Sequence, residues 1–387
     1  MQLHHHMDFH LVLFDYLIWI KLDDLHRVRK FKKDFSFGVA TSAYQVEGAW
    51  DKDGKGESIW DRYHHTHSEM IKDGRNGDEA CDSYHKYKRD VEMLRELGVH
   101  HYKFSISWPR VLPNGLANEI NEAGLEYYDN LINELLKYNI QPMVSMYNLD
   151  LPQNLQELGG WTNPLVSQWF EDYAEVLFEK FSDRVKLWIT MNNPTTVCFE
   201  TYLGILAPGI NSTGIGDYLC VKNVLVAHAK AYRLYESTYK KRYKGKNKIG
   251  LYVNPIWSKY GDFPLSVRNT IAKKSKEQGY AKSRLPSFTA DEIKLIKATN
   301  KKYPAPSLED DISMERREMR ERSGSSLSER YGLYEVDFGS EEKTRKARLS
   351  ALVYKRIIQK KIIEKDWEPK YWTISISNRT KSDKDEL

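Results

Sequence analysis

The stretch Trp188-Ile189-Thr190-Met191-Asn192-Asn193-Pro194 decides the fold prediction. The run from Val185 to Met191 is apolar, with β-branched and aromatic members, and it ends in two carboxamides, which predicts a buried strand with a polar tip. Pro194 cannot donate to a neighbouring strand and favours an extended Asn193, so the strand ends there. In a parallel α/β sheet, residues at such a tip face a small polar ligand. A simpler interpretation stays open, in which Asn192 and Asn193 cap the next helix.

Strand and helix patterns alternate along the chain on both sides of this stretch. The predicted strands and apolar runs are 35–42, 101–108, 140–147, 185–191 and 248–253, and the predicted helices are 82–97, 123–138, 164–181 and 218–243. This alternation is typical of a parallel sheet covered by helices. Because polar residues follow several of the strands, we predict an α/β fold of the (β/α)8 TIM-barrel type, whose active site gathers at the carboxyl ends of the strands.

The regular pattern fades after Asn254. We predict a long loop at 51–77, a short helix at 291–298, a charged irregular stretch at 301–330, an ordered run at 331–338 and a helix at 346–364. A barrel uses roughly 30 residues per unit. The segment between Val253 and Tyr331 therefore has no room for three complete units, and we expect the strands around the sixth to eighth units to be missing or degenerate. The predicted organisation is an N-terminal extension (1–33), one barrel domain (34–369) and a tail (370–387).

Composition describes a globular chain and excludes some functions. Its 387 residues suffice for a sizeable core, and the net charge of +5 is a small difference between 59 basic and 54 acidic residues, so no nucleic-acid partner is implied. Cys81, Cys198 and Cys220 are widely spaced and follow no metal-ligand pattern. They allow at most one disulfide, and nothing in the sequence selects the pair. We predict neither a metal nor a cofactor.

Signals near the two ends point to the secretory pathway. The last residues, Lys384-Asp385-Glu386-Leu387, form the retrieval signal of the endoplasmic reticulum, so we expect binding to the KDEL receptor and a lumenal location. The segments that start at Asn211 and Asn378 are glycosylation sequons. Phe9–Ile20 is apolar like a signal-peptide core, but Asp15 interrupts it, so an alternative amino terminus stays open. This run is too short to span a membrane.

Several motifs, in order, resemble glycoside hydrolase family 1, which includes β-glucosidase, lactase-like and myrosinase-like enzymes. The motifs are Phe37-Gly38-Val39-Ala40-Thr41-Ser42-Ala43-Tyr44-Gln45-Val46-Glu47-Gly48, Phe104-Ser105-Ile106-Ser107-Trp108-Pro109-Arg110, Leu151-Pro152-Gln153, Ala207-Pro208-Gly209, Leu285-Pro286-Ser287-Phe288-Thr289 and the run that ends at Phe338. The resemblance implies a barrel that hydrolyses β-glycosides with retention of configuration. That chemistry uses two carboxyl groups about 5 Å apart, one as acid/base and one as nucleophile.

The sequence departs from the family pattern at the positions that the family uses for catalysis and sugar binding. The resemblance puts Asn193 where the acid/base Glu belongs, and an amide cannot donate a proton near neutral pH. The chain contains no Thr-Glu-Asn-Gly segment, which carries the family's nucleophile. The eighth-strand segment that holds the sugar is also missing. Lys103 takes the place of an Arg near the nucleophile, and Asn148-Leu149 takes the place of a His-Trp pair that contacts the sugar.

Part of the sugar-binding shell survives. The resemblance implies that Gln45 and Asn192 bind sugar hydroxyls, although both can also be leftover polar caps on strand ends. We include Asn148 with them as a predicted substrate-binding residue. Glu47 and Asp150 are the nearest spare carboxylates, and the family uses neither for catalysis. The sequence leaves three hypotheses open: an active retaining β-glycosidase, a relative with impaired or lost activity that binds a glycan or a protein in the lumen, and an incomplete gene product. We favour a family member whose hydrolysis is impaired or absent.

Overall fold

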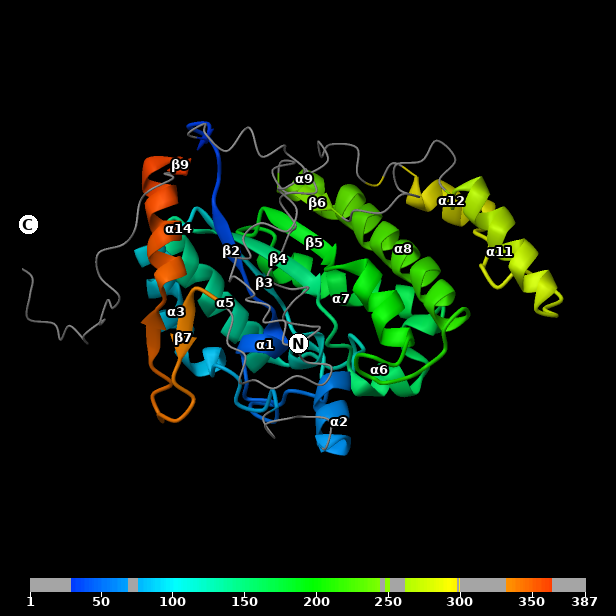
Figure 1. Cartoon of the computed structure of the whole chain (residues 1–387), viewed down its shortest axis with the longest axis horizontal. Helices are drawn as coiled ribbons and strands as arrows, with labels where there is room; N and C mark the ends of the chain where they lie inside the picture. Colours follow the sequence, from blue (N-terminus) through cyan, green and yellow to red (C-terminus); the bar gives the residue numbers. More distant parts are fainter. Residues whose placement is uncertain are drawn as a thin grey trace, which may run out of the picture.

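A sheet of five parallel strands forms the centre of the molecule (Figure 1). The computed structural model describes residues 29–68, 76–243, 248–250, 262–297, 299 and 332–363. The strands follow each other in chain order: β2 (Gly38–Ala40), β3 (His101–Ser105), β4 (Gln141–Tyr147), β5 (Leu187–Met191) and β6 (Lys248–Gly250). Neighbouring strands pair in register along the sheet, as at Val144 opposite Trp188. This is the parallel order that the sequence predicts.

Long helices connect the strands and cover one face of the sheet (Figure 1). They are α3 (Ser83–Leu97), α5 (Glu122–Lys137), α7 (Val166–Phe181) and α8 (Gly216–Leu234). Their apolar residues recur at helical spacing, so each helix buries one side. Helix α3 ends where Gly98 adopts a φ of 79° and its N–H reaches the carbonyls of Leu94 and Arg95, as the glycine stop predicts.

The packed core lies between the sheet and these helices, while the other face of the sheet is less covered. Val144 and Trp188 are buried on the helix side, where Trp188 meets the ring of Phe178 at 5.3 Å. Lys103 and Leu187, which point to the opposite face, are only half-buried. In a closed barrel this inner face fills with side chains. In the described chain β2 pairs only with β3, and β6 only with β5, so the sheet is an open part of a barrel.

The C-terminal part of the described chain packs against helix α3 and the edge strand β2. An antiparallel pair, β7 (Tyr334–Val336) and β8 (Arg345–Ala347), precedes helix α14 (Leu349–Lys360). Arg345 contacts Asp90 of α3 at 2.8 Å, and the Tyr354 hydroxyl donates to the carbonyl of Gly38 in β2. Helix α14 therefore lies beside α3, at the opposite end of the molecule from α11 and α12 (Figure 1).

Shorter elements complete the described chain. They are β1 (Arg29–Lys30), which pairs with β9 (Ile362–Ile363), and α1 (Ala43–Val46), α2 (Ile59–Thr66), α4 (Trp108–Val111), α6 (Gln153–Glu157), η3 (Gly160–Thr162), η4 (Thr196–Glu200), η5 (Tyr235–Tyr239), α9 (Lys240–Arg242), α11 (Leu265–Glu277) and α12 (Ala290–Ile296).

Three local predictions were wrong, and one helix was missed. The predicted loop at 51–77 contains α2, which starts with a capping box between Ser58 and Asp61. The predicted strand 101–108 ends at Ser105, because residues 108–111 form α4. The predicted helix 346–364 starts only at Leu349, because residues 345–347 pair with β7. Helix α11 was not predicted at all. Several predictions concern segments outside the described residues. These segments are the run Phe9–Ile20, Asn254, the stretch 301–330, the sequon at Asn378 and the C-terminal retrieval signal.

Candidate active site

Three polar side chains from neighbouring strands are joined at the carboxyl end of the sheet. Lys103 of β3 donates a hydrogen bond from Nζ to Oδ1 of Asn192, which directly follows β5. Asn192 in turn donates from Nδ2 to Oδ1 of Asn148, which follows β4, at 3.4 Å. The backbone N–H of Asn192 binds the carbonyl of Tyr147 and so extends the strand pairing by one residue. The register of three strands thus brings together two of the predicted sugar-binding residues and Lys103, which the resemblance puts in place of an Arg.

Asn193 occupies the next position and has a different role in the structure. Its backbone φ is +41°, a left-handed conformation that Asn tolerates better than most residues, so the extended conformation predicted from Pro194 is wrong. Its side-chain Oδ1 accepts a long hydrogen bond, 3.5 Å, from the backbone N–H of Thr196. The side chain therefore caps the turn that leads into η4, as the simpler interpretation of the sequence held for this residue. Asn193 is half-buried.

Gln45 lies on a separate strand end. It belongs to the one-turn helix α1 after β2, and its Oε1 accepts a hydrogen bond from the Ser42 hydroxyl. The backbone N–H of Ala43 donates to Oγ of Ser105 at 2.7 Å, which holds α1 against the end of β3. Gln45 is half-buried, and none of its described hydrogen bonds reaches Asn148 or Asn192.

The two spare carboxylates lie behind the strand ends in the buried layer. Glu47 accepts from Arg110 Nε at 2.8 Å and from the Tyr128 hydroxyl at 2.7 Å, and both charged side chains are nearly inaccessible. Asp150 is 1% exposed, and neither of its carboxylate oxygens meets hydrogen-bond geometry with another group in the described chain. Burial raises the pKa of Asp150 to about 8, and the nearby Ser107 hydroxyl offsets this only in part. Asp150 is therefore mostly protonated at neutral pH, and Glu47 is held by Arg110 and Tyr128, so neither group stands ready as a nucleophile.

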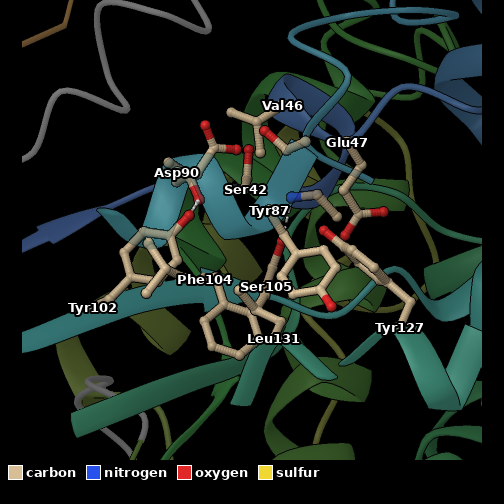
Figure 2. A pocket seen from close by; sticks show the side chains of 14 residues that line it. Ser42, Val46, Glu47, Tyr87, Asp90, Tyr102, Phe104, Ser105, Tyr127 and Leu131 are labelled. Atoms are coloured by element: carbon tan, nitrogen blue, oxygen red, sulfur yellow. Dashed lines mark hydrogen bonds between the residues drawn. The ribbon is translucent and has the colours of Figure 1, made fainter. Parts of the chain in front are cut away.

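A small pocket lies on the helix-covered side of the sheet (Figure 2). Its lining comes from β3 (Tyr102, Phe104), α3 (Tyr87, Asp90) and α5 (Tyr127), among others. None of Gln45, Asn148, Asn192 and Asn193 lines it. Asp90 is half-buried and already held by Arg345. The pocket is a packing gap between the sheet and helices α1, α3 and α5, and it does not contain the four predicted site residues.

The sequence did not reveal two covalent or polar links near the site. Cys198 and Cys220 form a disulfide, which joins η4 to α8 and leaves Cys81 outside it. Thr190 of β5 is hydrogen-bonded to Nδ1 of His228 on α8 at 2.9 Å, and burial lowers the pKa of His228 to about 3. The sequence could not show which two of the three cysteines pair. Nor could it predict which residue His228 contacts, because a single histidine in a helix pattern does not indicate its hydrogen-bond partner. Within the described residues, no cluster of side chains could hold a metal ion, and no helix is long and apolar enough to cross a membrane.

Comparisons with known proteins give the site its context. The family model Glycosyl hydrolase family 1 matches residues 27–259. Myrosinase 1 of Brevicoryne brassicae is 48% identical over 299 residues, which cover 70% of this chain and 64% of the relative. Human cytosolic beta-glucosidase is 38% identical over 299 residues, with the same two coverages. The chain thus spans just under two thirds of the length of these relatives.

Solved structures agree with the sequence comparison. Aphid myrosinase superposes with a TM-score of 0.76 and 34% identity, covering 86% of this chain and 100% of that one. A family 1 β-glucosidase from Thermotoga maritima superposes with a TM-score of 0.54 and 45% identity, covering 58% and 50%. Proteins of this family are (β/α)8 barrels, so the predicted fold class is confirmed. The chain belongs to glycosyl hydrolase family 1.

Proposed function

We propose that this chain is a family 1 glycosidase relative that binds a β-glycoside or glycan at its strand ends and hydrolyses it poorly or not at all. The observation that carries the proposal is Asn193, an amide at the end of β5 where the family resemblance places the acid/base carboxyl. General acid catalysis contributes roughly 10²–10⁴-fold to such reactions, and an amide cannot supply it. In the structure the Asn193 side chain instead caps the turn that leads into η4.

The nearby carboxyl groups offer no replacement. Glu47 is held by Arg110 and Tyr128 in the buried layer. Asp150 is buried, and a carboxyl whose pKa is about 8 is mostly protonated at neutral pH. The chain also contains no Thr-Glu-Asn-Gly segment, so the usual nucleophile has no counterpart in this sequence.

Sugar binding is supported by the polar chain of Lys103, Asn192 and Asn148. Amide and ammonium groups at the carboxyl ends of parallel strands can exchange hydrogen bonds with sugar hydroxyls. The relatives named β-glucosidase, lactase and myrosinase favour a β-glycoside as the ligand class.

Kinetics with a chromogenic β-glucoside test the loss of hydrolysis. We expect no turnover by the purified wild-type chain above a heat-inactivated control. The variant Asn193→Glu restores a carboxyl but no nucleophile, so we expect it to stay inactive, like the matched variant Asn193→Gln. A clear rate from the wild type would refute the proposal. A rate from Asn193→Glu alone would show that another carboxyl serves as nucleophile.

Binding is tested separately by thermal unfolding with glucose or cellobiose. A ligand at about 100 times its Kd raises the free energy of unfolding by about 2.7 kcal/mol, which is a measurable shift in Tm. We expect Asn192→Ala to abolish the shift and the exposed control Asn118→Ala to keep it. No shift in the wild type up to high sugar concentration would argue against sugar binding.

We further propose that the protein resides in the lumen of the endoplasmic reticulum. Its C-terminal retrieval signal and the buried disulfide between Cys198 and Cys220 support this, because disulfides form and persist in oxidising compartments. Deleting residues 384–387 should release the protein into the medium. If the deletion leaves the protein where it was, lumenal retrieval is wrong.

A further inference from the structure

The loop that follows β5 and η4 carries an acceptor for covalent sugar at its surface. Asn211, Ser212 and Thr213 form a sequon, and Asn211 is exposed. The Thr213 hydroxyl donates to Oδ1 of Asn211 at 3.1 Å. Within the described residues the amide nitrogen Nδ2 makes no hydrogen bond, so it is accessible and uncommitted.

The same loop exposes an unusual amount of apolar surface. Phe199, Leu203, Ile205, Ile210 and Ile215 are each between 38% and 48% exposed, all within residues 199–215. We call these five side chains the apolar loop surface. Several exposed apolar residues within one short loop indicate a contact surface or an aggregation hazard. An unprotected surface of this kind would be a liability in a crowded compartment.

The backbone places the acceptor directly beside this surface. Leu203 and Asn211 form an antiparallel bridge, and Ser212 N–H donates to the carbonyl of Tyr202 at 2.9 Å. Residues opposite each other in such a bridge point to the same side, with Cβ atoms about 5 Å apart. A group attached to Asn211 therefore leaves the protein next to Leu203. The disulfide from Cys198 to Cys220 fixes both ends of the loop.

We propose that Asn211 is N-glycosylated and that its glycan covers the apolar loop surface. In this reaction Asn211 Nδ2 loses a proton and forms a bond to the anomeric carbon of the first sugar. The bond from that carbon to the phosphate oxygen of a lipid-pyrophosphate-linked oligosaccharide breaks, and the lipid pyrophosphate leaves. The glycan is bulky and strongly hydrated. It therefore shields the neighbouring apolar side chains from other proteins.

This inference rests on the proposed lumenal location, so the experiment separates the two. The full chain is expressed in animal cells in its native form and fused to a cleavable secretion signal, and lumenal protein is recognised by protection from added protease. We expect a mobility shift that a peptide N-glycosidase removes, with the modification mapped to residue 211 by peptide mass spectrometry. Protected protein that lacks sugar at 211 would overturn the glycan while leaving the lumenal location intact. If the native form is digested by the added protease while the fused form is glycosylated at residue 211, only the proposed lumenal location is overturned.

Matched variants at the sequon give the control. Asn211→Gln and Thr213→Val, which keeps the side-chain shape without the hydroxyl, should both lose the shift. Thr213→Ser should keep it, and Asn378→Gln should leave the sugar at residue 211 in place.

Shielding is read by the fluorescence of an apolar dye on the folded protein. Enzymatic removal of the glycan should raise dye binding several-fold, and the additional change Leu203→Ser should reverse most of that rise. Equal dye binding with and without the glycan would refute the shielding role.

Discussion

Replacing Asp150 by Asn isolates the effect of a carboxyl that is buried without a partner. The folded protein keeps a proton on Asp150 up to about pH 8, whereas the unfolded chain releases it near pH 4. Between these values Asp150 binds more protons in the native state than in the unfolded state, so the contribution of this group to the stability of the wild type falls as pH rises. The slope is up to about 1.4 kcal/mol per pH unit, which accumulates to the order of 4 kcal/mol at pH 7.

Asn cannot ionise, so the variant lacks this contribution. Urea unfolding is followed by tryptophan fluorescence at pH 5, 6, 7 and 8. The free energy of unfolding of Asp150→Asn, relative to that of the wild type, should increase at each step. Asp51→Asn, at a largely exposed site, controls for the added amide. If the wild type and Asp150→Asn keep a constant difference from pH 5 to 8, Asp150 is ionised in the folded protein and the reasoning is wrong.

Three further predictions concern the buried links around the site. Replacing both Cys198 and Cys220 by Ala opens a loop of 22 residues and should lower the free energy of unfolding by about 3 kcal/mol, while a reductant should then have no further effect in urea titrations. Glu47→Gln leaves Arg110 buried without its counter-charge and should lower stability by about 3–5 kcal/mol, an expectation that an unchanged urea midpoint would contradict. Burial holds the pKa of His228 at about 3, so the contribution of His228 to stability should fall with decreasing pH between about 6.5 and 3, by up to about 1.4 kcal/mol per unit. The difference between the wild type and His228→Phe in acid titrations monitored by circular dichroism should show this contribution.

Elements with a strong apolar period were predictable from the sequence. The predicted helices 123–138 and 164–181 match α5 and α7 to within about two residues, because their apolar residues repeat at helical spacing. Helix α2 was missed because its capping box lies in a segment rich in Gly and Asp, whose composition predicts a loop. The pair β7 and β8 was missed because its strands are only three residues long.

The site was predictable in its members but not in its connections. The resemblance named Asn148 and Asn192, and their placement at adjacent strand ends follows from the order of the sheet. The bond from Lys103 to Asn192 spans 89 residues and depends on strand register, which no local pattern encodes. The roles of these residues in sugar binding, and the boundaries of the barrel domain, remain predictions.

Covalent trapping tests the loss of catalysis most directly. A retaining glycosidase attacks a 2-deoxy-2-fluoro-β-glucoside that carries a good leaving group and accumulates a glycosyl ester on its nucleophile. We predict that the intact mass of this protein stays unchanged after long incubation, under conditions in which an active family 1 β-glucosidase is fully labelled. A sugar adduct on any Glu or Asp of this chain would show that it has a working nucleophile and would contradict the account.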